Sequence, residues 1–327
     1  MDEKKIAIIL CVNNDTYFEE CLYYLNKLTI PEGYQVDLYD VRDAASIYEG
    51  YNEGMNASDA KYKLYIHQDV FILDPDALIN SINFFKEHPK CGLLGVVGGS
   101  TKPSDRFFYL SWDRGNVIFT TGEEYKHSDH SKAAEEVYAV DGMFMMTQYD
   151  LPWRSDILDG WDMYDFSQSI EFHRAGYEVW VPDQKMPWTL HDCGRLSVAG
   201  YDDRLIKFLN AYSDEFDVPA ILATREIYPK ENLEKYNMMM ELKKQLRALL
   251  AAGYTDEIKE ALSNAFGKSF YDNELLYISQ IASSKVMEPI IKEASSYEEI
   301  FDTYIRLLFD KIRNTDFYEL IRKKGTS

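Results

Sequence analysis

The chain has 327 residues, of which 46% are hydrophobic and 28% are charged, and its formal net charge at pH 7 is −20. This length and apolar content suffice for a buried core in one large domain with a smaller one, or in two domains. The excess of carboxylates disfavours nucleic acid as a partner, because phosphates are bound by clustered Lys and Arg. No apolar run approaches the roughly 18 residues of a membrane-spanning helix, so we expect no membrane span and a cytoplasmic protein.

The first hundred residues alternate between strand and helix patterns. The predicted order is a strand over 6–12, a helix from about Thr16 as its N-cap, a strand over 34–43, a helical or turn-rich segment over 44–58, a strand over 63–74, a helix over 74–89 and a strand over 91–99. Such alternation is typical of a parallel α/β sheet.

The rest of the chain divides into two parts. Residues 107–147 have a β and loop pattern, and 166–175 predict a helix that Gly176 closes, with a short strand over 177–183. From residue 225 apolar residues recur at helical spacing, and nearly all of the net negative charge lies before this point. We therefore predict an α/β domain over 1–224 and a helical module over 225–327.

Three polar residues, His67, Gln68 and Asp69, interrupt the apolar strand pattern over 63–74. An ionised carboxylate among apolar neighbours is costly unless it is paired or holds a metal ion. Ligands of α/β sheets bind beyond the carboxyl ends of the parallel strands, so these residues, Asn13 and the segment 40–43 should converge on one crevice.

A divalent cation is one possible partner for this carboxylate. Mn²⁺ and Mg²⁺ accept carboxylate, imidazole and phosphate ligands, and Asp69 with His191 could supply the protein side of such a site. Two further carboxylates, Asp162 and Asp165, stand just before the predicted helix of residues 166–175.

The ordered set of motifs resembles the family 2 glycosyltransferases with the GT-A fold. The likeness is closest to their glycosyltransferase-like branch, whose Asp-x-Asp element reads His-Gln-Asp. It rests on "IAIILCV", "YNEGM", "YIHQDVFI", "VDGMFMM" and "WDMYDFSQSIEFHRAGY", followed by His191, and covers about residues 4–200. It implies a nucleotide-diphospho-sugar transferase fold, with a mixed, mainly parallel sheet flanked by helices.

The resemblance also implies roles for single residues. Asp69 would bind a metal ion, Mn²⁺ or Mg²⁺, on the donor diphosphate with His191 as a second ligand, and Asp165 would be the general base. The implied donor-binding residues are Asn13, Asp40, Asp43, Asn52, His67, Gln68 and Asp69, and the implied acceptor-binding residues are Asp141, Gly142, Trp161 and Asp162.

The implied activity is metal-dependent, inverting transfer of a sugar from a nucleotide-diphospho-sugar to a glycan or glycoconjugate, within polysaccharide biosynthesis for the cell surface. A UDP-sugar is the favoured donor. His67 stands in place of the first acid of Asp-x-Asp, and Tyr164 in place of the Glu of the family's Glu-Asp element. A second hypothesis is therefore a non-catalytic nucleotide-sugar-binding protein whose helical tail recruits partners. The tail could also form a homo-oligomer.

Each candidate residue also has a structural interpretation. Asp69 could cap a turn, His191 could be a structural histidine, and Asp165 could be the N-cap of its helix, with Asp162 as the rival base. Four tryptophans fall near the proposed site, where sugars stack on aromatic rings, although core packing is the commoner role: Trp112, Trp153, Trp161 and Trp188.

Overall fold

The computed structural model describes residues 1–119, 124–126, 133–184, 187–192 and 200–224. Nearly all of them belong to one compact unit, formed by Met1–Val117, Tyr125–His191 and Ser197–Tyr228. A second unit takes Ile118–Glu124, Asp192–Leu196 and Pro229–Ser327, almost entirely outside the described residues. The helical module over 225–327 and the domain boundary at residue 224 stay predictions.

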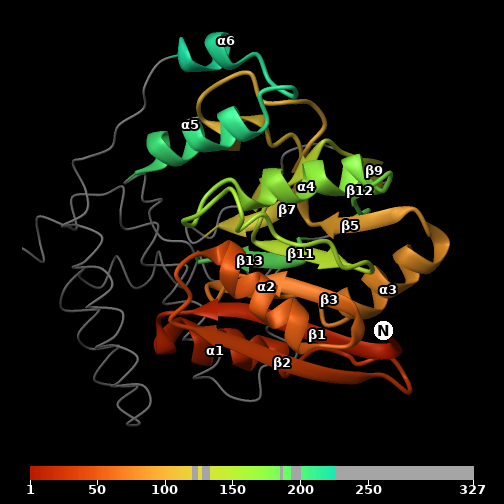
Figure 1. Ribbon diagram of the computed structural model, residues 1–327. Helices are drawn as coiled ribbons and strands as arrows, with labels where there is room; N and C mark the ends of the chain where they lie inside the picture. Colours follow the sequence, from red (N-terminus) through yellow and green to blue (C-terminus); the bar gives the residue numbers. More distant parts are fainter. Residues whose placement is uncertain (120–123, 127–132, 185–186, 193–199, 225–327) are drawn as a thin grey trace, which may run out of the picture. The chain divides into compact units, whose positions relative to one another are not determined.

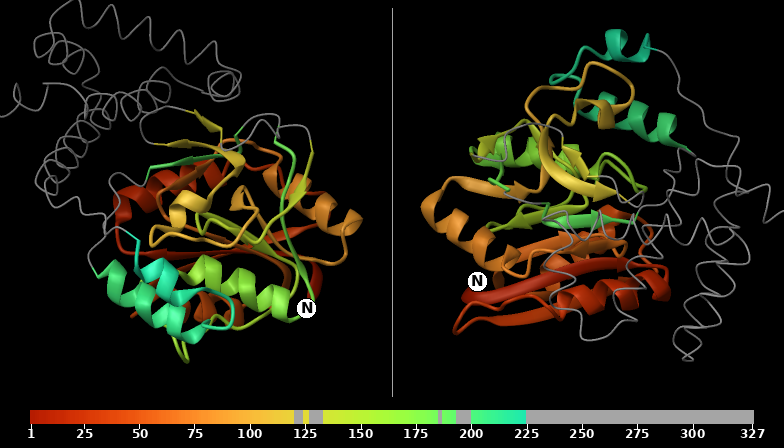
Figure 2. Two further views of the ribbon diagram at one scale, coloured as in Figure 1. Left: turned by 90° about the horizontal axis from the view of Figure 1, so that it is seen from above. Right: turned by 180° about the vertical axis from the view of Figure 1, so that it is seen from behind.

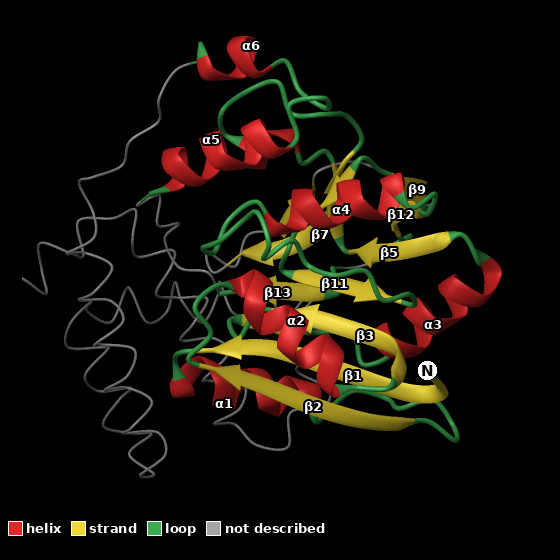
Figure 3. Ribbon diagram, viewed as in Figure 1, coloured by secondary structure: helices red, strands yellow, loops and turns green. Residues whose placement is uncertain are grey.

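Strands and helices alternate over the first part of the described chain, and a run of strands follows before α4 (Figures 1 and 3). The strands are β1 (Asp2–Val12), β2 (Gln35–Arg42), β3 (Ala60–Ile66), β4 (Val70–Ile72), β5 (Cys91–Gly95), β6 (Val97–Gly99), β7 (Arg114–Phe119), β8 (Glu124–Lys126), β9 (Glu135–Glu136), β10 (Ala139–Val140), β11 (Phe144–Thr147), β12 (Glu178–Val181) and β13 (Thr189–His191). The helices are α1 (Asp15–Leu25), α2 (Ile47–Ala57), α3 (Ala77–Glu87), the 3₁₀ helix η1 (Phe108–Ser111), α4 (Tyr164–Arg174), α5 (Tyr201–Ala211) and α6 (Val218–Leu222).

The main sheet has seven strands in the order β2-β1-β3-β11-β5-β12-β9. Strand β1 pairs in parallel with both β2 and β3, and β12 pairs in parallel with β5. Strand β11 runs antiparallel between β3 and β5, and β9 is antiparallel to β12. The mixed, mainly parallel sheet that the sequence predicts is thus confirmed.

A second sheet forms because two predicted strands change sheets midway. It has the order β10-β6-β7-β13-β4, and its β7, yellow, is seen from behind in Figure 2. The strand predicted over 63–74 leaves the main sheet after β3 and enters the second sheet at β4. The strand predicted over 91–99 likewise splits into β5 and β6. Between β3 and β4 the three polar residues form a turn, closed by Val70 N donating to His67 O at 3.2 Å.

Helices α2 and α4 lie in front of the main sheet in Figure 1. Gly50 and Gly54 share one face of α2; a Cβ on Gly50 would overlap the Cys11 side chain of β1, and a Cβ on Gly54 would overlap that of Ile9. This close approach brings α2 onto the sheet. No helix among the described residues has the length and apolarity that a membrane crossing requires.

The ends of two helices test the predicted caps. Thr16 is not the N-cap of α1, because the helix begins one residue earlier and Tyr17 N donates to Asn14 Oδ1 at 3.3 Å. Asn is as good a cap as Thr, and the polar end of β1 runs directly into the helix. The predicted stop at Gly176 is confirmed: its φ is +84°, and Tyr177 N donates back to Phe172 O at 3.0 Å.

Candidate functional site

The turn between β3 and β4 brings His67 and Asp69 close to His191 at the end of β13, in a cluster of three side chains that could hold a metal ion. Asp69 Oδ1 lies 3.7 Å from His191 Nε2 and 3.9 Å from His67 Nδ1. All three ligand atoms lie within 4.8 Å of one another. The register of the second sheet explains the meeting, because β13 places His191 opposite Val70, next to the turn.

The donor set of this cluster fits a divalent cation. Two ligands bonded to one ion at about 2.1 Å stand roughly 3 to 4.2 Å apart, so the observed separations need little adjustment. Burial lowers the pKa of His67; Asp69 opposes this shift, the nearby imidazole of His191 adds to it, and Asp141 opposes it. The neutral imidazole favoured in this way is the form that binds metal ions.

Gln68, the middle residue of the turn, connects it to the end of β1. Its Oε1 accepts hydrogen bonds from Asn13 N at 3.0 Å and Asn14 N at 2.9 Å. Its Nε2 donates to Asn13 Oδ1 at 2.5 Å. The structure therefore brings Asn13 and the polar turn together, and the Gln68 amide is used within the chain to hold them.

The predicted residues of the second strand lie at its exposed end. Asp40 is inside β2 and accepts a hydrogen bond from Arg42 Nε at 3.1 Å. Arg42 also donates to Asp15 at 2.8 Å, which ties the strand end to α1. Asp43 follows the strand with a φ of +58° and is exposed.

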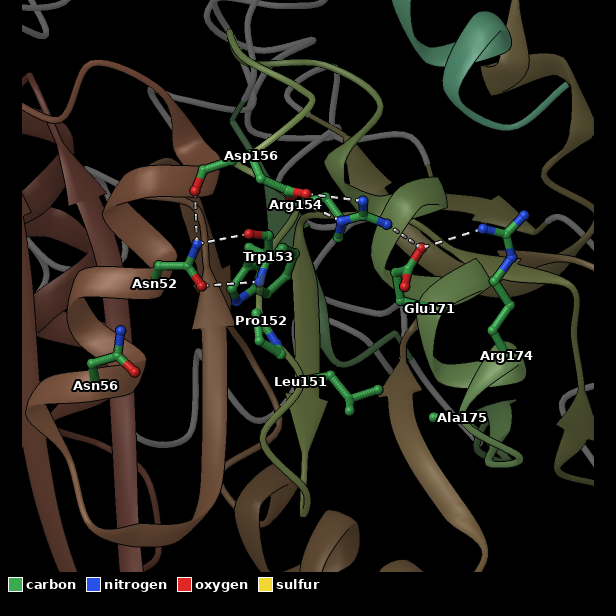
Figure 4. Close-up of a pocket in the computed structure, with 11 residues that line it drawn as sticks. Asn52, Asn56, Leu151, Pro152, Trp153, Arg154, Asp156, Glu171, Arg174 and Ala175 are labelled. Atoms are coloured by element: carbon green, nitrogen blue, oxygen red, sulfur yellow. Dashed lines mark hydrogen bonds and ion pairs between the residues drawn. The ribbon is translucent and has the colours of Figure 1, made fainter.

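Asn52 belongs to a separate pocket between α2 and α4 (Figure 4). Its Nδ2 donates to Trp153 O at 2.7 Å, and its Oδ1 accepts from Trp153 N at 2.9 Å. The pocket wall continues with Arg154 and Glu171, which form an ion pair at 3.1 Å. Among the described residues, Asn52 is thus grouped with the Trp153 loop and not with the His67 cluster.

Asp165 lies in the first turn of α4 and is only 7% exposed. Its two carboxylate oxygens accept hydrogen bonds from Phe166 N at 2.8 Å and Gly142 N at 3.2 Å. Burial, and next the charge of Asp141, raise its pKa to about 8. Asp165 is not the helix N-cap, because that position belongs to Met163, which has left-handed backbone angles.

Three of the predicted acceptor residues lie near this carboxylate: Gly142 donates a hydrogen bond to it, and the charges of Asp141 and Asp162 act on it. Asp141 Oδ1 accepts a hydrogen bond from Met143 N at 2.9 Å, in the loop between β10 and β11. Asp162 is buried and bonded to Arg204 Nε, so the rival base already has a cationic partner. Trp161 is 46% exposed in the segment before α4.

Three of the four candidate tryptophans pack in the core. Trp112, Trp153 and Trp188 are all buried, and Trp112 stacks on Phe166 with ring centroids 4.7 Å apart. Of the four, Trp161 alone presents a large exposed surface.

The raised pKa of Asp165 predicts a pH-dependent stability. Its value in the native state lies above the ordinary 3.8, so the native state binds this proton more tightly, and stability falls as pH rises from about 4 to about 8. Asp165→Asn removes the titration. The free energy of unfolding of the variant minus that of the parent should therefore increase from pH 5 to pH 8, by at most about 1.4 kcal/mol per unit.

Urea unfolding of both proteins across this pH range measures the effect. Asp159→Asn, at a carboxylate 65% exposed in a nearby loop, is the matched control and should show a much smaller trend. A difference that is flat with pH for Asp165→Asn would contradict the raised pKa.

Comparison with known proteins identifies the class of this chain. Residues 7–212 match a family described as glycosyltransferase-like, and the chain belongs to that family. The predicted resemblance is confirmed, and the mixed sheet flanked by helices has the GT-A type of α/β fold that goes with it. No curated protein has a significantly similar sequence.

The comparison with solved structures also gave matches, at low sequence identity. A mannosyltransferase from Pyrobaculum calidifontis, solved with GDP-Man and Mn²⁺, is 14% identical and has a TM-score of 0.41, covering 94% of this chain and 88% of its own. TarS residues 1–349 from S. aureus, solved with UDP, is 13% identical with a TM-score of 0.40, covering 98% and 92%.

The sequence prediction missed two features of the site. It assigned His67 to the donor but not to the metal cluster, in which the structure places it beside Asp69 and His191. It also treated Tyr164 only as a departure from the family pattern, whereas its hydroxyl forms a hydrogen bond with His67 Nε2. The sequence did carry a signal: His67 and Tyr164 are the two positions at which the chain departs from the family motif, and this could have suggested that they act together.

Proposed function

We propose that this glycosyltransferase is metal-dependent and inverting, and that it moves a sugar from a nucleotide-diphospho-sugar, with a UDP-sugar favoured, to a glycan or glycoconjugate. The observation that carries the proposal is the meeting of Asp69, His67 and His191 at the edge of the sheet where ligands of α/β folds bind. A bound divalent cation there would supply positive charge to the leaving diphosphate.

The residues around the cluster would hold the donor. Gln68 fixes the loop that carries Asn13 against the metal-binding turn, so a nucleotide would meet a preformed surface. Asp40 and Asp43 lie at the end of the second strand, and the family pattern implies that they approach the nucleobase and ribose of the donor.

Asp165 would act as the general base. It would take the proton from the acceptor hydroxyl as the oxygen attacks the anomeric carbon and the nucleoside diphosphate leaves from the opposite face, which inverts that carbon. A base works best when its pKa is close to the working pH, and burial has moved the pKa of this carboxyl to about 8. The Arg204 partner of Asp162 argues against that carboxylate as the base.

Trp161 would offer a stacking surface for the acceptor sugar. Replacing Trp161 by Ala should raise the acceptor KM about tenfold, or roughly 1.4 kcal/mol, while slow hydrolysis of the donor stays unchanged. Trp161→Phe keeps a ring and should recover most of the acceptor affinity. An unchanged acceptor KM in the Ala variant would remove Trp161 from the acceptor site.

A non-catalytic nucleotide-sugar-binding protein is the second candidate. The observation in its favour is that His67 and Tyr164 replace two acids of the family motif. The cytoplasmic location, a cell-surface glycan as the product, and partner recruitment or self-association through residues 225–327 stay predictions.

A thermal-shift screen of nucleotide sugars, with and without Mn²⁺, tests the proposal. A ligand that binds only the native state stabilises it by about 2.7 kcal/mol at 100 times its Kd. We expect at least one nucleotide sugar to raise the unfolding temperature, and Mn²⁺ to enlarge that shift. No shift with any donor, with or without the metal ion, would contradict the proposal.

A further inference from the structure

Tyr164 is buried in an aromatic cage. Its ring packs edge-on against Tyr48 and Tyr51, with centroids 6.4 and 5.9 Å away, and lies 6.2 Å from Trp153. Gly142 makes room for the hydroxyl, because a Cβ on this glycine would overlap Tyr164 Oη. The hydroxyl group is therefore held in one place.

That place is next to His67. The Tyr164 hydroxyl forms a hydrogen bond with His67 Nε2, while His67 Nδ1 faces Asp69 at 3.9 Å. A neutral imidazole carries one proton, so one ring nitrogen is a donor and the other has a free lone pair. When Nε2–H donates to the tyrosine oxygen, the lone pair of Nδ1 points to the side of Asp69.

We propose that Tyr164 is a positioning residue that holds His67 in its Nε2–H tautomer, so that Nδ1 joins Asp69 and His191 as the third metal ligand. This inference rests on the metal site of the proposed function. The inference links the two departures from the family motif, His67 and Tyr164, as one coupled change. A carboxylate at position 67 could bind a metal ion unaided, whereas an imidazole needs a hydrogen-bond acceptor for the N–H of its other nitrogen.

The choice of a phenol over a carboxylate as that acceptor follows from the burial of this position. Burial, and next the charges of nearby groups that include Asp165 and Asp141, keep the pKa of the Tyr164 hydroxyl well above the ordinary value. A tyrosine therefore accepts the hydrogen bond as a neutral group, without adding a buried negative charge.

The tautomer can be read in the metal-free protein. Long-range ¹H–¹⁵N spectra distinguish Nε2–H from Nδ1–H imidazoles, and the signal of His67 is assigned by its loss in His67→Asn. At pH 8 we expect Nε2–H in the parent and a mixture, or Nδ1–H, in Tyr164→Phe. Tyr51→Phe is the matched control, because Tyr51 Oη is buried with no hydrogen-bond partner among the described residues and its ring contacts Tyr164.

Calorimetric titration with Mn²⁺ alone gives the second readout. Loss of an outer-shell partner typically costs about 10- to 100-fold in metal affinity, and we expect this loss for Tyr164→Phe and no loss for Tyr51→Phe. Gly142→Ala keeps the hydroxyl but displaces it, and should also weaken Mn²⁺ binding.

The outcomes separate this inference from the proposed function. Equal Mn²⁺ affinity of the parent and Tyr164→Phe, or an Nδ1–H tautomer in the parent, would overturn the role of Tyr164 and leave the metal site standing. A parent protein that binds no Mn²⁺ would overturn the metal site and this inference with it.

Discussion

Replacing Asp165 by Asn should slow transfer of the sugar, and the slow hydrolysis of the donor, by about 10² to 10⁴, the usual contribution of a general base. The change removes the proton acceptor but keeps the size of the side chain. Donor affinity should hardly change, because a base that acts in the transition state contributes little to binding of the ground state. The measurement is the rate of nucleoside-diphosphate release at saturating metal ion, parent against variant.

Asp159→Asn is the control for this experiment. It makes the same chemical change at an exposed carboxylate that pairs with Lys207 at 2.6 Å, and it should leave the rate unchanged. Unchanged release by Asp165→Asn would falsify its role as base and direct the search to Asp162 or Asp141.

Replacing Asp69 by Asn should weaken Mn²⁺-dependent binding of the nucleotide by more than about 100-fold, the upper range for an outer-shell partner. Asp69 is the only carboxylate of the described metal cluster, and its Oδ1 lies within 4 Å of both imidazoles. A neutral amide cannot replace its negative charge toward a hard cation. Calorimetry of nucleoside diphosphate binding, with Mn²⁺ and with EDTA, measures the loss.

Asp76→Asn is the matched control for this second variant. Asp76 follows β4 in the same region, is exposed, and its side chain forms no capping hydrogen bond to α3. Binding that depends on Mn²⁺ to the same extent in Asp69→Asn and in the parent would remove Asp69 from the metal site.

The alternation of strands and helices made most of the fold predictable. The period of apolar residues located β1 and β2, and the glycine after α4 located the end of that helix. The change of sheet between β3 and β4 was not predictable, because an apolar segment looks the same whether it continues in one sheet or enters another. The three polar residues marked the place but not the new direction.

The site was predictable where the motif supplied the chemistry. Asp69 and His191, 122 positions apart in the chain, were paired by the family pattern and meet across one contact of 3.7 Å. Side-chain partners within the protein were not predictable. The bonds of Asn52 to the Trp153 backbone and of Tyr164 to His67 depend on how α2 and α4 pack on the sheet, which no local pattern encodes.

Turnover by the parent protein tests the central claim most directly. The measurement is nucleoside-diphosphate release from a panel of nucleotide sugars, with Mn²⁺ or EDTA and with candidate glycan acceptors. We predict release from at least one donor that binds, and its loss in EDTA. Binding of a donor in the thermal-shift screen without any release from it would contradict the enzymatic account and favour a nucleotide-sugar-binding protein without turnover.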